Sequence, residues 1–265
     1  MKIEVLNPHG FCAGVTAALK TAQSILAGGE AWCLHEIVHN ELVVASLKAA
    51  GMRFTDDLSL VPEGATVVFS AHGVSPAVRR EAEGRKLKIV DATCPFVKKV
   101  HTAARAFSDK GLPVVVIGKR DHAEVKGIVG EAERAFIYPE LPEDGPLGVV
   151  SQTTMNADEV GAITAELAKT RELETMAEVC RATKERQDAV KAFQGDALLV
   201  LGSATSSNTR RLCEVARCRT FLAGTMDEVC AMDFAGVEHL GVTSGASTPE
   251  EFFNKVIDRL RGKTK

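Results

Sequence analysis

Short apolar runs alternate with amphipathic stretches along the chain, and this pattern predicts strands alternating with helices. The runs Val114–Ile117 and Ala197–Leu201 are apolar throughout. Continuous apolar runs of this length are typical of parallel strands that are covered on both faces. The pattern therefore predicts an α/β fold. We expect strands at 2–6, 31–38, 65–70, 88–90, 112–118, 148–151, 197–202 and 240–243, and helices at 13–28, 41–50, 75–84, 95–110, 157–170, 181–193, 249–261 and from residue 209.

Three cysteines recur at nearly equal intervals along the chain, and each precedes a predicted helix. They are Cys12, Cys94 and Cys180. The N–H groups and the dipole at a helix N-terminus favour the thiolate form of such a cysteine. The even spacing predicts a threefold internal repeat. We place the three lobes at 1–93, including the N-terminal strand, at 94–179 and at 180–265.

Polar residues follow two predicted strands in each repeat, at matching distances from the cysteine. The nearer group consists of His39, His122 and Ser206. The second group lies roughly twice as far from each cysteine along the sequence and consists of His72, Thr153 and Ser247. Only Ser247 departs from the matching distance, because a longer connector precedes it. Ligands of α/β proteins bind at the carboxyl ends of strands. We therefore expect three α/β lobes, related by a pseudo-threefold axis as a trefoil, to face one central cavity.

The charge and composition of the chain limit the classes of protein to which it can belong. The chain has 265 residues and a formal net charge of −3, so nothing indicates a nucleic-acid or membrane partner. The sequence contains no apolar run of the roughly 18 residues that a membrane helix needs. It also begins without the pattern of a secretory signal, and we expect a cytoplasmic protein. Four of the seven cysteines fall outside the repeat and are interpreted as buried or surface thiols: Cys33, Cys213, Cys218 and Cys230.

Three converging thiolates suit zinc with a fourth ligand or an iron–sulfur cluster. The Cys-x-x-Cys spacing typical of zinc sites is missing from the sequence. A cubane cluster with three thiolates leaves one iron open for a substrate oxygen. The polar loops, which suit a phosphate or diphosphate, contain His39, His72, His122, Ser206, Ser207, Asn208 and Ser247. Glu124 suits a proton donor, whereas His9, His35, His101 and His239 lie outside the register and are interpreted as structural.

These motifs resemble the LytB (IspH) family of 4-hydroxy-3-methylbut-2-enyl diphosphate reductases over nearly the whole chain. The matching segments begin at Asn7-Pro8 and end at Ser247-Thr248-Pro249. Singly most are weak, but together they are specific: Gly10-Phe11-Cys12-Ala13-Gly14-Val15, Glu36-Ile37-Val38-His39-Asn40, Phe69-Ser70-Ala71-His72-Gly73-Val74, Asp91-Ala92-Thr93-Cys94-Pro95, His122-Ala123-Glu124-Val125, Ser151-Gln152-Thr153-Thr154, Ser206-Ser207-Asn208 and Gly245-Ala246-Ser247.

The resemblance implies a 4Fe-4S cluster held by Cys12, Cys94 and Cys180, with one open iron that binds the allylic hydroxyl of the substrate. Two electrons and protons would then remove that oxygen as water and give isopentenyl and dimethylallyl diphosphate. Thr153 and Glu124 would lie at the hydroxyl, with Glu124 in the proton path. A flavodoxin or ferredoxin with its reductase would supply electrons. The diphosphate would be held by His39, His72, Ser206, Ser207, Asn208 and Ser247, with His122 nearby.

Several segments depart from the family pattern. Residues 181–187 replace a Thr-rich segment, Ala17 replaces a basic residue, and Lys119-Arg120-Asp121 replaces a more neutral loop. None of these changes removes a proposed ligand. Lys119 and Arg181 would instead alter the charge around the cavity.

Two other functions fit three thiolates with an open iron. An iron–sulfur hydro-lyase acting on a phosphorylated substrate would use the iron only as a Lewis acid and would need no electrons. A cluster-based sensor would need an output surface, and the sequence contains no DNA-reading motif. The sensor interpretation also leaves Glu124 and Thr153 without a role.

Overall fold

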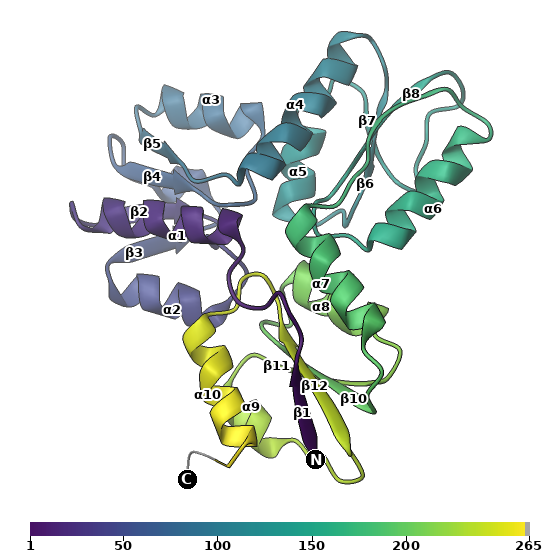
Figure 1. Ribbon diagram of the computed structural model, residues 1–265. Helices are drawn as coiled ribbons and strands as arrows, with labels where there is room; N and C mark the ends of the chain where they lie inside the picture. The colour runs from purple at the N-terminus through teal and green to yellow at the C-terminus, as the bar shows by residue number, and fades with distance from the viewer. Residues whose placement is uncertain (263–265) are drawn as a thin grey trace. The chain divides into compact units, whose positions relative to one another are not determined.

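The computed structural model describes residues 1–262 and contains three four-stranded sheets in which every pair of neighbouring strands is parallel (Figure 1). The chain divides into two compact units. One contains residues 1–13, 39–43 and those from 181 onward, and the other contains residues 14–38 and 44–180. The three parallel-sheet lobes confirm the predicted α/β class.

The first two sheets lie in the second unit and have the same topology. Their strand orders are β3-β2-β4-β5 and β7-β6-β8-β9, so that the second strand in sequence lies at one edge and the fourth at the other. The first repeat contains α1 (Ala13–Leu26), β2 (Ala31–Leu34), α2 (Glu41–Ala49), β3 (Met52–Thr55), the short 3-10 helix Leu58–Leu60, β4 (Thr66–Phe69), α3 (Pro76–Gly84) and β5 (Lys88–Asp91). The second contains α4 (Pro95–Asp109), β6 (Val114–Ile117), α5 (Ala123–Val129), β7 (Ala135–Ile137), β8 (Leu147–Ser151), α6 (Ala157–Ala168) and β9 (Leu173–Met176).

The third sheet has the order β11-β10-β12-β1, and its fourth position is filled by the first strand of the chain. Residues of β1 from Lys2 to Val5 pair in parallel with residues of β12 from His239 to Val242. The sequence prediction grouped this N-terminal strand with lobe 1, whereas the structure pairs it in lobe 3; the lobe boundaries remain a prediction. The elements of lobe 3 are β1 (Lys2–Val5), α7 (Arg181–Ala192), β10 (Ala197–Leu201), α8 (Ser207–Val215), β11 (Arg219–Ala223), α9 (Met226–Ala231), β12 (His239–Ser244) and α10 (Glu250–Leu260).

The predicted strands that fill the sheet centres are confirmed, and the strands that were missed lie at edges. All residues of β6, β8 and β10 are buried. The missed edge strands β3, β7, β9 and β11 are less buried, and their sequences are short or interrupted by polar residues. The strand predicted at 31–38 was too long, because β2 ends at Leu34 and His35 adopts a left-handed backbone with φ +62°. His35 therefore lies in a turn.

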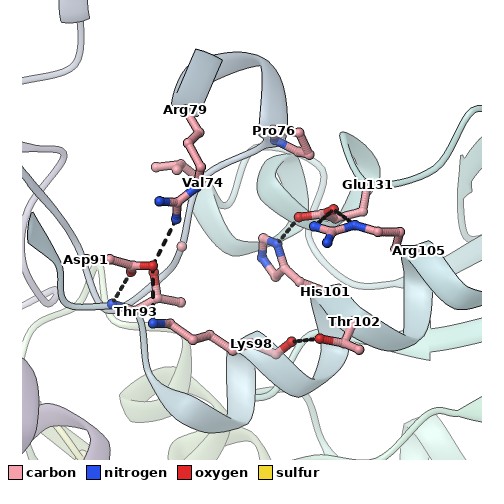
Figure 2. Close-up of a pocket in the computed structure, with 11 residues that line it drawn as sticks. Val74, Pro76, Arg79, Asp91, Thr93, Lys98, His101, Thr102, Arg105 and Glu131 are labelled. Carbon is pink, nitrogen blue, oxygen red and sulfur yellow. Dashed lines mark hydrogen bonds and ion pairs between the residues drawn. The ribbon is translucent and has the colours of Figure 1, made fainter. Parts of the chain in front are cut away.

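An ion-paired carboxylate fixes the turn between β5 and α4, which carries Cys94 (Figure 2). Asp91 accepts from Arg79 at 2.9 Å, lies 3.1 Å from the Lys98 ammonium and accepts from the Thr93 amide at 3.0 Å. Burial alone would raise the pKa of Asp91, but hydrogen bonds from Thr93, Lys98 and Arg79 outweigh it and hold that pKa at about 2. Asp91 is thus ionised near neutral pH and joins α3, β5 and α4.

Within the described residues, no helix is long and apolar enough to cross a membrane.

A close contact between β8 and α4 generates the first prediction. A Cβ atom added at Gly148 would lie 2.5 Å from the Phe107 Cβ, which is far inside van der Waals contact. We expect Gly148→Ala to lower the free energy of unfolding by about 1–3 kcal/mol through overpacking. Gly161→Ala in α6 is the control, because that site is open and alanine favours a helix by about 1 kcal/mol. Urea unfolding of both variants checks this, and equal stabilities would contradict it.

Candidate active site

The six predicted polar positions follow the two central strands of each sheet. His39, His122 and Ser206 come after β2, β6 and β10, which are the first strands after the cysteine-bearing segments of their repeats. His72, Thr153 and Ser247 come after β4, β8 and β12. Each lobe therefore presents its polar residues at the carboxyl ends of neighbouring parallel strands, as the sequence register predicts.

Glu124 and Thr153 form a buried pair in the second unit. Glu124 is 2% exposed and lies in the first turn of α5. Its Oε1 accepts from the Thr153 amide at 2.7 Å, and its Oε2 accepts from the Thr153 hydroxyl at 3.1 Å. Burial raises the pKa of Glu124 to about 7, against the lowering effect of the two hydrogen bonds from Thr153. This carboxyl group can therefore donate a proton near neutral pH.

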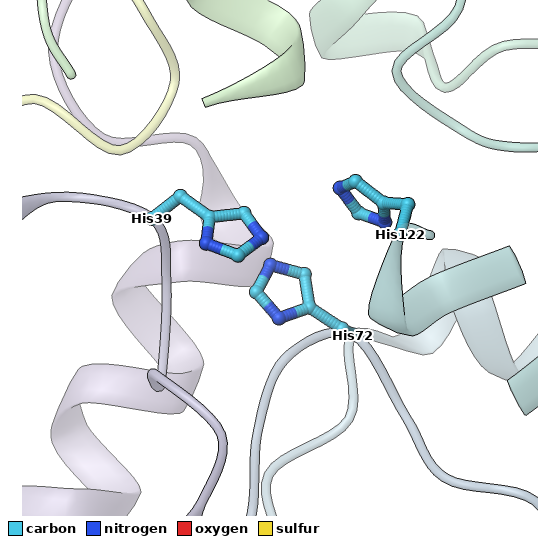
Figure 3. A group of neighbouring side chains, drawn as sticks. All are labelled: His39, His72 and His122. Atoms are coloured by element: carbon cyan, nitrogen blue, oxygen red, sulfur yellow. The ribbon is translucent and has the colours of Figure 1, made fainter. Parts of the chain in front are cut away.

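His72 and His122 lie close together in the same unit (Figure 3). Their ring centroids are 5.4 Å apart, with the rings at 87° to one another. The Nδ1 atom of His122 accepts from the Glu124 amide at 3.2 Å and caps α5. With Nδ1 as an acceptor, the neutral ring carries its proton on Nε2, which can donate to an anion. The Nδ1 atom of His72 is 3.3 Å from the Ser70 hydroxyl, which orients its ring.

The start of α8 lies in the first unit. The Ser206 hydroxyl caps this helix by accepting from the Thr209 amide at 3.3 Å. Asn208 is 4% exposed, and neither its Nδ2 nor its Oδ1 has a hydrogen-bond partner within the described residues. A buried amide that lacks its hydrogen bonds is unfavourable, so Asn208 fits a ligand that would supply them. Together with the positive end of the helix dipole, Ser206, Ser207 and Asn208 suit an anion.

One backbone hydrogen bond, repeated in all three lobes, links each cysteine to the loop after the strand β12, β4 or β8. The Cys12 amide donates to the Ala246 carbonyl at 3.1 Å, and the Cys94 amide donates to the Ala71 carbonyl at 3.1 Å. The Cys180 amide donates to the Thr153 carbonyl at 3.0 Å. Ala246 and Ala71 immediately precede Ser247 and His72. Each cysteine is therefore tied to the loop that carries a predicted substrate-binding residue.

The loop carrying Cys12 is held further by groups that the sequence did not single out. The Gly10 amide donates to the Ser244 hydroxyl at 2.8 Å, and Arg186 donates through Nη2 to the Gly10 carbonyl at 2.8 Å. Arg186 is only 2% exposed. It lies in a helix rich in charged residues, where a basic residue usually marks the solvent face, so the pattern gave no signal for it. The hydroxyl of Ser247 donates to the His39 carbonyl at 3.0 Å, which joins the segment carrying His39 to this network.

The three repeated cysteines differ from the other four in their surroundings and therefore in their fitness as metal ligands. Cys12, Cys94 and Cys180 are partly exposed, and each immediately precedes a helix. By contrast, burial raises the pKa of Cys33 to about 12 and, with the nearby Glu214 carboxylate, that of Cys213 to about 11. Burial also raises the pKa of Cys218, and Cys230 is exposed. The three repeated cysteines therefore fit thiolate ligands of an iron–sulfur cluster, whereas protonated thiols such as Cys33 and Cys213 do not.

The histidines interpreted as structural all have partners. The His9 ring packs against the Phe253 ring, with centroids 4.0 Å apart and the two planes tilted by 55°. The other three are paired with carboxylates at 2.8 to 2.9 Å, namely His35 with Asp56, His101 with Glu131 and His239 with Glu4.

Two of the charged departures from the family pattern are paired with carboxylates. Arg120 is paired with Glu140 at 2.6 Å, and Arg181 is paired with Glu185 at 2.6 Å. Ala17 is exposed on α1. The amide of Lys119 donates to Gln152 Oε1 at 3.0 Å, so a buried glutamine joins the loops after β6 and β8.

Comparisons with known proteins agree on one family. The model of the LytB protein family matches residues 3–261. A relative in Burkholderia mallei, named 4-hydroxy-3-methylbut-2-enyl diphosphate reductase 2, is 42% identical over 98% of this chain and 86% of its own length. A 4-hydroxy-3-methylbut-2-enyl diphosphate reductase from Dechloromonas aromatica is 39% identical over 100% of this chain and 92% of its own length.

Solved structures agree with these relatives. The structure of the E-1-hydroxy-2-methyl-but-2-enyl-4-diphosphate reductase from Plasmodium falciparum is 32% identical, with a TM-score of 0.91 over 98% of this chain and 87% of that one. A structure described as (E)-4-hydroxy-3-methyl-but-2-enyl diphosphate reductase, the terminal enzyme of the non-mevalonate pathway, is 30% identical, with a TM-score of 0.70 over 99% of this chain and 100% of that one.

The raised pKa of Glu124 predicts a pH-dependent stability difference. Between about pH 4.5 and 7 the folded state keeps the Glu124 proton that the unfolded state loses, so stability falls as the pH rises through this window. Glu124→Gln removes this loss. We subtract the free energy of unfolding of the unaltered protein from that of Glu124→Gln at each pH. We expect this difference to be up to about 3 kcal/mol larger at pH 8 than at pH 4.5.

Anaerobic urea unfolding across this pH range measures the difference. Glu166→Gln is the control, because the Glu166 side chain is 68% exposed. A stability difference for Glu124→Gln that does not change with pH would contradict the prediction.

Proposed function

Because this chain belongs to the LytB family, we infer that it is a 4-hydroxy-3-methylbut-2-enyl diphosphate reductase of the non-mevalonate isoprenoid pathway. The enzyme removes the allylic hydroxyl of (E)-4-hydroxy-3-methylbut-2-enyl diphosphate. Two electrons and two protons convert the substrate into water and isopentenyl or dimethylallyl diphosphate. Within the site, the observation that carries this chemistry is the buried Glu124–Thr153 pair, because it keeps a proton donor at neutral pH.

We propose that Cys12, Cys94 and Cys180 hold a 4Fe-4S cluster with one open iron. Their partial exposure, their positions before helices and their shared hydrogen-bond pattern support this role. Such a cluster supplies electrons and a Lewis-acidic site for an oxygen ligand. The cysteine loops keep the three ligands in register with the substrate loops.

We propose that the diphosphate is bound by the polar side chains that follow the central strands of the sheets. Asn208 supplies its unpartnered amide, and the start of α8 supplies N–H groups. His122 donates from Nε2, as its tautomer dictates. The histidines thus add donors to an anion site that also contains hydroxyl groups. The full proposed set is His39, His72, His122, Thr153, Ser206, Ser207, Asn208 and Ser247.

We propose that Glu124 delivers the proton that lets the substrate hydroxyl leave as water. Thr153 donates to both carboxylate oxygens, through its amide and its hydroxyl, and so fixes the carboxyl orientation. A bound diphosphate adds negative charge, which favours the protonated carboxyl further. Thr153 lies at the hydroxyl and His122 completes the catalytic set. We also propose a flavodoxin or ferredoxin with its reductase as the electron donor, and the cytoplasm as the location.

The cluster proposal predicts that two cysteine variants differ in cluster content and turnover. We expect Cys94→Ser to lose most of its iron and sulfide and at least ~100-fold of its turnover, because a hydroxyl is a poor iron ligand. Cys33→Ser is the control and should keep its cluster, since burial keeps that thiol protonated. The measurements are iron and sulfide content after anaerobic purification, and turnover with a dithionite–viologen donor.

Full activity of Cys94→Ser would contradict the cluster proposal. Turnover that needs no reductant would favour the hydro-lyase alternative. A cluster without turnover in the unaltered protein would favour the sensor.

The diphosphate proposal predicts a binding defect in Asn208→Ala. Loss of hydrogen bonds to a charged oxygen is worth about 1.5–3 kcal/mol, so we expect KM to rise about 10- to 100-fold. Asn156→Ala is the control, because Asn156 caps α6 by accepting from the Asp158 amide and affects stability alone. An unchanged KM for Asn208→Ala in steady-state kinetics would remove Asn208 from the site.

A further inference from the structure

The edge of the His101 ring fills the space between two glycines that come from different lobes. A Cβ added at Gly73 would lie 3.0 Å from His101 Nε2, and a Cβ added at Gly127 would lie 3.0 Å from His101 Cε1. Gly73 immediately follows His72 in lobe 1, and Gly127 lies in α5, nearly one turn after Glu124, in lobe 2. A single imidazole therefore touches both segments.

The ring is held rigidly from its other side. His101 is 8% exposed, and its Nδ1 lies 2.8 Å from Glu131 Oε1. Glu131 has a side chain only 4% exposed and also accepts from the Arg105 Nε at 2.9 Å. Burial alone would raise the pKa of Glu131, but His101 and Arg105 outweigh it and lower that pKa, so the carboxylate stays ionised. His101 Nε2 has no hydrogen-bond partner among residues 1–262, so the ring edge acts by its shape.

Two further contacts join the same segments. A Cβ added at Gly130, which caps α5, would lie far inside van der Waals contact with the Ser75 Cβ, and one added at Gly127 would lie 3.6 Å from the Val74 carbonyl carbon. A cavity of about 230 Å³ lies on the side of His101 and Glu131, with Arg79 and Asp91 across it (Figure 2). A second cavity of about 340 Å³ is lined by Ala123 and Gly127 of α5 and by residues of lobe 1. Gly73 and Val74 line both cavities. Because open space flanks the His101 contact on both sides, the spacing between the His72 loop and α5 depends on what fills the gap between the two glycines as well as on the contact of Ser75 with Gly130.

We propose that His101 is a positioning residue that sets the distance from His72 to the helix carrying His122 and Glu124. It touches no substrate. The His72–His122 ring separation of 5.4 Å is the quantity it controls. The role in turnover rests on the proposed function, because it matters only if Glu124 must deliver a proton to a substrate anchored by His72.

Two opposite changes of the gap test the proposal. Gly127→Ala adds a methyl group against the ring while improving the helix, and His101→Asn removes the ring edge while keeping a donor for Glu131. We expect each to lower kcat at least ~10-fold per cluster-containing enzyme, because proton delivery is sensitive to shifts of about 1 Å. KM should change less than about threefold, since several other groups hold the diphosphate.

The double variant His101→Asn with Gly127→Ala gives the decisive comparison. The smaller side chain leaves room for the methyl group, so we expect kcat to recover to within about threefold of the unaltered enzyme, a strong non-additivity. Thr102→Ala, on the rim of the same cavity, is the control and should change nothing. A double variant as slow as the product of the two single effects would overturn the proposal. Loss of thermal stability with unchanged kcat would also overturn it.

Crystal structures of the variants provide a readout that does not depend on turnover. The His72–His122 ring separation should change in each single variant and return in the double variant. If the unaltered protein does not reduce the diphosphate, the proposed function fails, and the ring separations still decide whether His101 sets the spacing. An unchanged separation in both single variants would overturn the inference while leaving the proposed function intact.

Discussion

A backbone hydrogen bond from each repeated cysteine to the loop after β12, β4 or β8 is the constraint on which the candidate site depends. Side chains can change without affecting it, because it joins an amide to a carbonyl. It ties Cys94 to the loop of His72 and Cys180 to Thr153. A shift of a proposed cluster ligand would therefore move a proposed substrate-binding residue with it. In the proposed reaction a cluster and a proton donor act on the same oxygen, and this shared backbone keeps Cys180 beside the loop whose Thr153 holds Glu124.

Electrostatics distinguishes the residues that could react from those that hold the fold. Asp91 is surrounded by donors and stays ionised, whereas Glu124 accepts hydrogen bonds from Thr153 and is buried more deeply. Two carboxyl groups in one unit thus differ widely in pKa, from about 2 to about 7. The first suits a permanent ion pair and the second suits proton transfer. The same division appears among the thiols, where burial keeps Cys33 protonated.

The central strands, the repeat and the strand-end positions of the polar residues could be predicted because each depends on local pattern. Continuous apolar runs such as β10 favour a buried strand, because at five residues they are too short for a typical helix. Edge strands such as β9 could not be predicted, because half-exposed strands lack that run. The pairing of β1 with β12 joins residues that are far apart in the sequence, so no local pattern of residues predicts it. Arg186 and Gln152 were missed for a similar reason, since polar residues are usually exposed and only the fold shows them buried.

The position of β1 in the third sheet also governs when the site can form during synthesis. Chains emerge from the ribosome N-terminus first, and domains usually fold in that order. Here β1 finds its partner strand only after residues 239–242 have been made, and Cys12 finds its carbonyl acceptor only after Ala246. Of the three repeated cysteines, the first to be translated is therefore the last to be positioned. A nascent chain can hold Cys94 and Cys180 in place while Cys12 stays unanchored, so all three cysteines are positioned only after Ala246 has been made.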